Sequence, residues 1–493
     1  MTRKSILISL LVLASIVLLP SCGGMGGTYY GGYNQNDELI NGEEYNEIQE
    51  KGFADPLINP LSNFSLDSSS YAYSNIRRLI LDGQTVEKDA VVIEQMLNYF
   101  NYSYKNETEE ALSSSLELAA CPWNEEHYLA AISVNAKEIE MQDSKNNFVF
   151  LIDTSGSMSD YNKLGLFQES FRLLANSIDE NDTISIVTYA SGVRVVADGI
   201  NGSQKLDLVE AVDSLMAGGS TNGSGGIQKA YEIAQKHFIQ DGNNRILLAT
   251  DGDFNVGIYN DGQLNDFISS KRKTGVYLSI LGYGIGNTQH DTMELLAKNG
   301  NGNAYYIDSL LEARKVFVAE LGSVLNTVAK DSKIQVEFNP NNVVKYRLLG
   351  YENSMLTNDQ FEDENTDAGE IGAGHTTIAM YEIELKDELV KEYILKTKLR
   401  YKEPSDETQK EIVNELNTIS SSPSNDFRFA AAVVEFGLIL RDSAYKGSAN
   451  YNHLLDILND TTLLNDEYKV EFKSIVEHSQ RIYLANQEYI NID

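Results

Sequence analysis

The residues with the clearest chemical potential lie in three short loops. Asp153, Ser155 and Ser157 share the first loop, Thr221 lies in a glycine-rich second loop, and Asp251 follows a short apolar run. The carboxyl ends of parallel strands meet at one edge of a sheet, so these loops are expected to converge. Two carboxylates and three hydroxyls are hard oxygen donors, which suit Mg²⁺, Ca²⁺ or Mn²⁺ and not Zn²⁺. The spacing therefore predicts a divalent-cation site, with Mg²⁺ as the first choice.

The elements that must position these loops lie between residues 147 and 321, where continuous apolar runs alternate with amphipathic stretches. The apolar runs predict five buried strands and one antiparallel edge strand, at 148–152, 183–189, 245–249, 276–281, 304–307 and, for the edge, 193–197. Apolar residues recur at helical spacing over 164–178 and 227–234, which predicts helices with one face on the sheet. The predicted fold class is α/β, a doubly wound and mostly parallel sheet.

The order Asp-x-Ser-x-Ser, then Thr, then Asp resembles the metal-ion-dependent adhesion site of von Willebrand factor type A domains. Asp153, Ser155, Ser157, Thr221 and Asp251 match that pattern completely, each on the expected loop. The resemblance implies that the hydroxyls coordinate the ion directly, while the aspartates act directly or through water. It also implies an open coordination position for an Asp or Glu of a protein partner, and therefore metal-dependent adhesion or assembly without enzymatic activity.

The flanking segments resemble the regions beside the A domain in a family of bacterial envelope lipoproteins. The similar stretches are 59–73, 93–99, 121–124, 350–353 and 367–375. We therefore predict an N-terminal flanking domain at 44–145, the A domain at 146–325 and a C-terminal flanking domain at 326–493. The first flank is expected to be mixed α and β, and the second β-rich with helical additions, because strand alternation after residue 331 gives way to a helical tail.

The N-terminus has the features of an export signal over residues 1–22. Two basic residues precede an apolar run at 6–19, which is too short to span a bilayer, and the run ends in Leu19-Pro20-Ser21-Cys22. That tetrapeptide resembles a lipobox, which implies acylation of Cys22 and a lipid anchor in a bacterial membrane, with the outer membrane as the first choice. A plain secretory signal or an uncleaved anchor is the alternative. Residues 23–43 are rich in Gly, Tyr and Asn and predict a flexible tether.

Composition narrows the function classes further. The chain has 493 residues, with 39 Lys and Arg against 72 Asp and Glu, giving a net charge of −33. A surface this acidic repels nucleic acid, so no nucleic-acid partner is expected. With Cys22 acylated, Cys121 has no partner for a disulfide within the chain, and its apolar neighbourhood predicts a buried, inert thiol.

Other chemistries fit the sequence less well. The glycine-rich segments 218–226 and 282–286 lack the P-loop and dinucleotide spacings, so no nucleotide is expected. No nucleophile elbow occurs, and the segment 251–262 fails the EF-hand pattern. Two function classes therefore remain ahead of a hydrolase. The first is an adhesion or assembly module with an open metal face, and the second is an envelope scaffold whose ion is capped internally, for example by the acidic run 362–367.

Overall fold

The structure is a computed structural model, and it describes residues 45–490 apart from short segments. The segments outside the description are 67–68, 105–107, 139–144, 222, 241, 253–260, 285–289, 321–326, 367 and 405. The predicted export signal with Cys22 and the predicted tether therefore lie outside the described residues.

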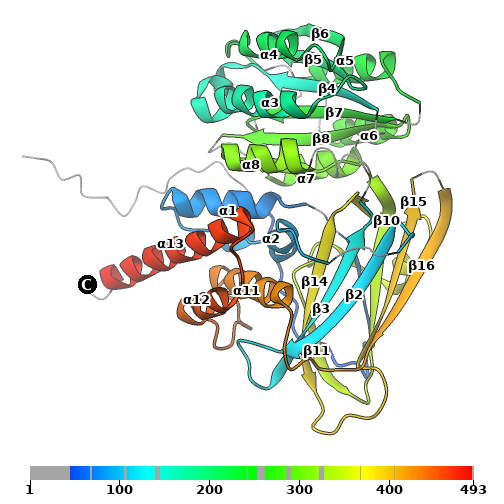
Figure 1. Cartoon of the computed structure of the whole chain (residues 1–493), viewed down its shortest axis with the longest axis vertical. Coiled ribbons are helices and arrows are strands. Elements are labelled where there is room, and N and C mark those ends of the chain that lie inside the picture. Colours follow the sequence, from blue (N-terminus) through cyan, green and yellow to red (C-terminus); the bar gives the residue numbers. More distant parts are fainter. Residues whose placement is uncertain are drawn as a thin grey trace, which may run out of the picture. The chain divides into compact units, whose positions relative to one another are not determined.

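The A domain contains a six-stranded sheet in the order β6-β5-β4-β7-β8-β9 (Figure 1). Its strands are β4 (Asn146–Asp153), β5 (Thr183–Tyr189), β6 (Val193–Asn201), β7 (Asn243–Thr250), β8 (Val276–Tyr283) and β9 (Ala304–Ile307). Every neighbouring pair is parallel except β5 and β6, which pair antiparallel at the edge. The predicted buried strands and the antiparallel edge strand are confirmed.

Helices cover both faces of this sheet. Successive side chains of a strand point to opposite faces, so strands that are buried along their whole length need a covering layer on each face. The helices are α3 (Leu166–Ser177), α4 (Lys205–Asp213), α5 (Gly223–Lys236), α6 (Asp261–Arg272), α7 (His290–Asn299) and α8 (Leu310–Arg314). On one face Phe150 of β4 packs against Phe171 of α3, with ring centroids 5.2 Å apart. On the other face Leu151 belongs to a separate core with Ile227 of α5. The doubly wound α/β class is confirmed.

The flanking segments build two antiparallel sheets together. One runs β12-β1-β10-β15-β16 with β13 beside β10, and the other runs β11-β14-β3-β2. Their strands are β1 (Leu61–Ser65), β2 (Leu112–Ala120), β3 (His127–Ala136), β10 (Thr327–Phe338), β11 (Val343–Leu349), β12 (Met355–Leu356), β13 (Gly369–Gly372), β14 (Thr376–Leu385), β15 (Leu395–Glu403) and β16 (Asp406–Leu416). The sequence predicts two separate flanking domains, whereas here β1 pairs with β10 and β3 with β14. Pairing between such distant segments leaves no local pattern in the sequence.

The flanks also contribute a helical layer with its own core. Its helices are α1 (Tyr71–Leu81), α2 (Ile93–Asn98), α11 (Asn425–Leu440), α12 (Tyr451–Asp460) and α13 (Glu467–Ile490), and a short α10 (Asn358–Glu362) lies apart from them. Cys121 and Trp123 belong to this core. Cys121 is a free, buried cysteine whose pKa is raised by burial, as the sequence predicts for an inert thiol. Among the described residues, no helix is both long and apolar enough to cross a bilayer.

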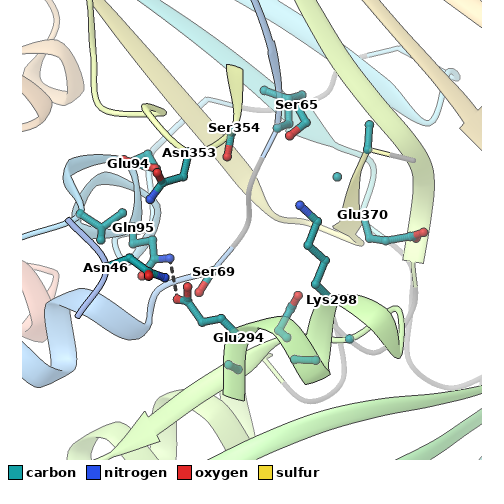
Figure 2. Close-up of a pocket in the computed structure, with 18 of the residues that line it drawn as sticks. Asn46, Ser65, Ser69, Glu94, Gln95, Glu294, Lys298, Asn353, Ser354 and Glu370 are labelled. Carbon is teal, nitrogen blue, oxygen red and sulfur yellow. Dashed lines mark hydrogen bonds between the residues drawn. The ribbon is translucent and has the colours of Figure 1, made fainter. Parts of the chain in front are cut away.

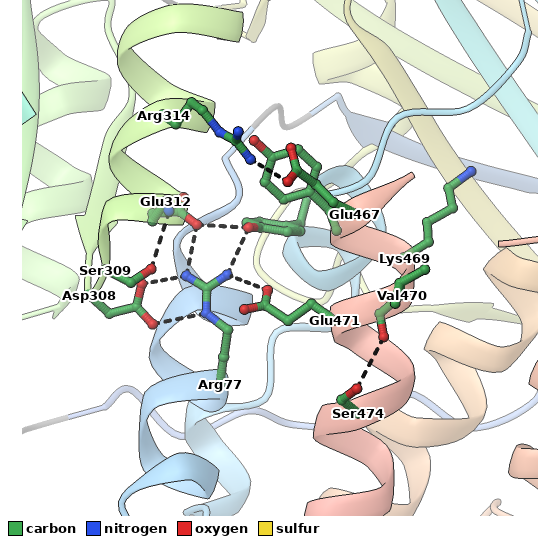
Figure 3. Close-up of polar contacts among 12 residues, drawn as sticks. Arg77, Asp308, Ser309, Glu312, Arg314, Glu467, Lys469, Val470, Glu471 and Ser474 are labelled. Carbon is green, nitrogen blue, oxygen red and sulfur yellow. Dashed lines mark hydrogen bonds and ion pairs between the residues drawn. The ribbon is translucent and has the colours of Figure 1, made fainter. Parts of the chain in front are cut away.

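A buried ion network joins the flanks to the A domain around Arg77 of α1 (Figure 3). The Arg77 guanidinium is 1% exposed and donates to Asp308 Oδ2 at 2.9 Å, to Glu312 Oε2 at 2.9 Å and to Glu471 Oε2 at 3.0 Å. Its Nη1 also donates to the Tyr99 hydroxyl at 2.8 Å. Since Asp308 and Glu312 belong to the A domain and Glu471 to α13, one side chain ties three segments of the chain together.

Candidate metal centre

The predicted ligands lie near the middle of the sheet, where strands that follow β4 in the chain are added first on one side of it and later on the other. From β4 the chain adds β5 and then β6 on one side, and it later adds β7, β8 and β9 on the other side. β4 and β7 are parallel neighbours, with Ile152 opposite Ala249. Asp153 ends β4 and Asp251 follows β7, so both carboxylates lie at the carboxyl edge of adjacent strands. Such a switch point is where open α/β sheets bind their ligands.

The first loop brings three oxygen ligands together. Asp153 Oδ1 accepts a hydrogen bond from the Ser155 backbone N–H at 2.7 Å, and the Ser155 and Ser157 hydroxyls lie 3.0 Å apart. Asp153 Oδ2 is buried and accepts no well-aligned hydrogen bond from the described residues. Burial raises the Asp153 pKa above its ordinary value, although hydrogen bonds from Ser155 and the nearby Tyr189 oppose the rise. This oxygen therefore lacks the positive partner that a buried carboxylate requires.

The second loop is held against the first by backbone hydrogen bonds. The Gly218 N–H donates to Thr154 O at 2.8 Å, and the Gly156 N–H donates to Gly219 O at 3.0 Å. Gly219 has a φ of +89°, and a Cβ there would lie 2.6 Å from Ser191 Oγ, so this turn requires glycine. Thr221 follows two residues later, half-buried, just before α5 begins. The structure thus brings the loop that carries Thr221 beside the loop that carries the two serines.

The third loop carries Asp251, which is buried and ion-paired. Lys163 Nζ lies 2.9 Å from Asp251 Oδ2 and donates to the Ser157 carbonyl oxygen at 3.0 Å. The Lys163 side chain is 8% exposed and that of Asp251 is 0% exposed. One ammonium group therefore connects the first and third loops inside the predicted metal site.

Lys163 is not among the site residues predicted from the sequence, although its position in the sequence indicates that it is buried. Lys163 stands three and four residues before Leu166 and Phe167, both of which are buried in the A-domain core. Helical spacing thus places a lysine on the buried face of an amphipathic stretch. A charged residue at such a position requires a buried counter-ion, so the pattern predicts a carboxylate nearby but does not say which one.

The set of ligands fits a hard divalent cation. Two carboxylates and three hydroxyls belong to the set. The described residues contain no group of three or more His, Cys, Asp or Glu side chains arranged to hold a metal. Oxygen ligands of this kind suit Mg²⁺, Ca²⁺ or Mn²⁺. The buried Asp153 Oδ2, which accepts no well-aligned hydrogen bond, is the feature that a bound cation would satisfy.

The acidic run 362–367 lies elsewhere, against basic residues of the flanking sheet. Glu362 forms an ion pair with Arg400 at 2.8 Å, and the carbonyl oxygen of Asp363 accepts from Lys333 Nζ at 2.6 Å. The carbonyl oxygen of Glu364 accepts from Lys402 Nζ at 2.7 Å. The described part of this run is therefore held by the strands β10 and β15.

A separate polar cavity of about 210 Å³ lies between α2, α7 and neighbouring loops (Figure 2). Gln95 Nε2 donates to Glu294 Oε1 at 2.7 Å on one side, and the Lys298 side chain points into the cavity from another. Glu94 is 2% exposed, and burial, reinforced by the charge of Glu352, raises its pKa to about 8. Glu94 is thus mostly neutral at pH 7, which gives a measurable pH effect on stability.

Three parts of the chain match known protein families. Residues 147–318 match the family described as von Willebrand factor type A domain, residues 39–131 match one described as von Willebrand factor, and residues 323–482 match one described as uncharacterized protein YfbK, C-terminal. The uncharacterized protein YfbK of Escherichia coli (strain K12) is 38% identical over 448 residues, covering 85% of this chain and 78% of the relative.

Other proteins show more distant similarity to this chain. A von Willebrand factor A domain-containing protein of Dictyostelium discoideum is 28% identical over 160 residues, covering 32% of this chain and 16% of the relative. Among solved structures, von Willebrand factor type A from Catenulispora acidiphila has a TM-score of 0.40 and 15% identity, covering 73% of this chain and 89% of that chain. The ArnB paralog VWA2 from Sulfolobus acidocaldarius has a TM-score of 0.36 and 15% identity, covering 76% and 98%. Because the identity to the E. coli protein extends over most of both chains, this chain belongs to the YfbK family of von Willebrand factor type A domain proteins.

Proposed function

We propose that this protein binds another protein through a divalent cation held by its A domain, as an adhesion or assembly module. The observation that carries the proposal is the buried Asp153 Oδ2, which accepts no well-aligned hydrogen bond from the described residues. It belongs to the same loop as the paired hydroxyls of Ser155 and Ser157, at the switch point of the sheet. A divalent cation is the partner that such a group of oxygens favours, with Mg²⁺ ahead of Ca²⁺ and Mn²⁺.

The proposed ligands are Asp153, Ser155, Ser157, Thr221 and Asp251. The bound ion supplies an electron-poor position, and an Asp or Glu side chain of a protein partner has the matching chemistry. Three of these five ligands are neutral hydroxyls, which donate less electron density to the ion than carboxylates do. We therefore propose binding without catalytic turnover.

We also propose that the ion faces an outside partner and is not capped by the chain's own acidic run. The ion pair between Glu362 and Arg400, on the flanking sheet, supports this choice. The doubly neutralised variant Glu362→Gln, Glu364→Gln tests it, because an internal cap would compete with any added carboxylate. Unchanged affinity of the Mg²⁺-loaded protein for acetate is expected, and a marked gain would favour the capped scaffold.

The proposed location is the bacterial cell envelope, with a lipid anchor on Cys22 in the outer membrane. This part of the proposal is based on the sequence of the export signal, where Cys22 follows Leu19-Pro20-Ser21. A tether of about twenty residues would then separate the membrane surface from the folded part of the chain. Partners would accordingly be envelope or extracellular proteins.

Direct metal binding tests the central claim. The chain from Gly23 onward is titrated with Mg²⁺ by calorimetry and melted with and without the ion. Saturation at 100 times Kd should stabilise the wild type by about 2.7 kcal/mol. Asp153→Asn should abolish both signals. The matched control is Asp182→Asn, which alters another buried carboxylate. Asp182 lies just before β5, at the amino ends of the strands and therefore away from the proposed metal site. Equal stabilisation of Asp153→Asn by Mg²⁺ would place the ion elsewhere and contradict the proposal.

A further inference from the structure

Lys163 gives the metal centre a positive charge of its own. We infer that the Lys163 ammonium group is a resident cation that neutralises Asp251, so that a bound divalent ion depends on a partner's carboxylate for charge balance. The inference rests on the proposed function, because it concerns the same ion and the same partner group. It assigns Lys163 the role of a residue that sets the balance between metal affinity and ligand affinity.

The contacts of Lys163 fix its ammonium group at the centre. Nζ lies 2.9 Å from Asp251 Oδ2 and 3.0 Å from the Ser157 carbonyl oxygen, so it touches both loops that bear aspartates. Its stem passes over Gly284 at the end of β8, where a Cβ would lie 2.4 Å from Lys163 Cε. Gly284 also has a φ of +85°, a conformation that favours glycine. A bare backbone thus leaves room for the lysine stem.

The charge of the centre follows from these contacts. Asp153 and Asp251 together contribute two negative charges, and Lys163 offsets one of them. A divalent ion added to the remaining single negative charge leaves one net positive charge at the centre. An incoming Asp or Glu side chain cancels that charge. Without Lys163, the two aspartates would balance the ion by themselves, and the pull on an outside carboxylate would weaken.

Removing the ammonium group should therefore change two affinities in opposite directions. Metal affinity should rise, because the repulsion between ammonium and ion disappears and Asp251 becomes available to the ion. Affinity for a carboxylate at the loaded centre should fall, because the net positive charge is lost. A lysine that only supported the loops would give a different result, since its loss would weaken both kinds of binding together.

The experiment uses the chain from Gly23 onward and the variant Lys163→Met. Calorimetry with Mg²⁺ measures metal affinity, and the proton relaxation of the acetate methyl group, with Mn²⁺ saturating the centre, measures carboxylate affinity. We expect metal binding to tighten by about tenfold or more and acetate binding to weaken by a similar factor, given one unit of charge near the ion. Lys236→Met is the matched control, because it removes an exposed lysine paired with Asp198 near the end of α5. It should leave both affinities unchanged.

The remaining outcomes are distinguishable. Metal binding that stays the same or weakens in Lys163→Met overturns the inference, and so does unchanged acetate binding. If the wild type binds no Mg²⁺ but Lys163→Met does, the resident cation is supported while the proposed function fails. If Lys163→Met does not fold, Lys163→Gln takes its place, and Lys163→Arg must retain the affinities of the wild type because it keeps the charge.

Discussion

Replacing Arg77 with methionine should uncouple the flanks from the A domain. The guanidinium bonds two carboxylates of the A domain, Asp308 and Glu312, and one carboxylate of α13, Glu471. Methionine fills a similar volume without charge or donors, so the change removes the ion network and keeps most of the packing. The wild-type segments are expected to unfold in one step because this network lies between them.

The expected cost follows from the burial of the three carboxylates. Their exposed fractions are 6% for Asp308, 1% for Glu312 and 24% for Glu471, so two of the three have almost no access to water. Removing one partner of a buried ion pair costs about 3–5 kcal/mol, because the other charge stays behind without compensation. We expect Arg77→Met to lose stability within that range.

The assay uses the position of the single tryptophan. Trp123 is 1% exposed in the core of the flanks, and the chain has no other tryptophan. Its fluorescence therefore follows the flanks, while far-ultraviolet circular dichroism follows the whole chain. In urea the two signals should coincide for the wild type and separate for Arg77→Met. Arg441→Met is the control, because it removes a buried arginine paired with Glu352 inside the flanks. Coincident signals in Arg77→Met, or a loss below about 1 kcal/mol, would refute this reasoning.

Two further predictions concern the anchor and the polar cavity. Cys22→Ala should release the protein from the membrane fraction or stop its processing, because the residue proposed to be acylated is lost. Normal processing with unchanged membrane association would exclude the lipid anchor. Glu94→Gln should raise the melting temperature at pH 8 and change it little at pH 5. The raised pKa of Glu94, about 8, means that its contribution is full below about pH 4.5 and is lost as the pH rises toward 8. The difference between the two pH values should be about 2–4 kcal/mol, and an equal shift at both would contradict the assignment.

Much of the A domain could be predicted from its sequence because its strands are buried on both faces. The apolar run 148–152 identifies β4, and Asp153 follows it directly at the edge where ligands bind. Short local patterns were sufficient there. Parallel strands alternate with amphipathic helices along the chain, so the order of elements also predicts which loops lie at the same edge.

The pairing of the flanks and the charge of the proposed metal centre could not be predicted in the same way. Strand β1 pairs with β10, Leu61 opposite Glu337, and nothing in the local alternation of either strand identifies the other. Lys163 presents a related difficulty, since helical spacing shows that it is buried but only the folded chain shows that it binds Asp251. Pairings of this kind depend on tertiary contacts that a single sequence does not display.

The described contacts between the flanks and the A domain lie away from the proposed metal centre. Arg77 binds Asp308 just after β9, and Tyr71 of α1 packs against Tyr306 of β9 with ring centroids 5.5 Å apart. β9 is the outermost strand on its side, while Asp153 lies on β4 at the middle of the sheet. Three strand spacings of about 4.8 Å separate β4 from β9, or about 14 Å along the sheet. The described flank contacts thus hold the A domain by its β9 side, and a partner that reaches the β4 and β7 loops need not displace them.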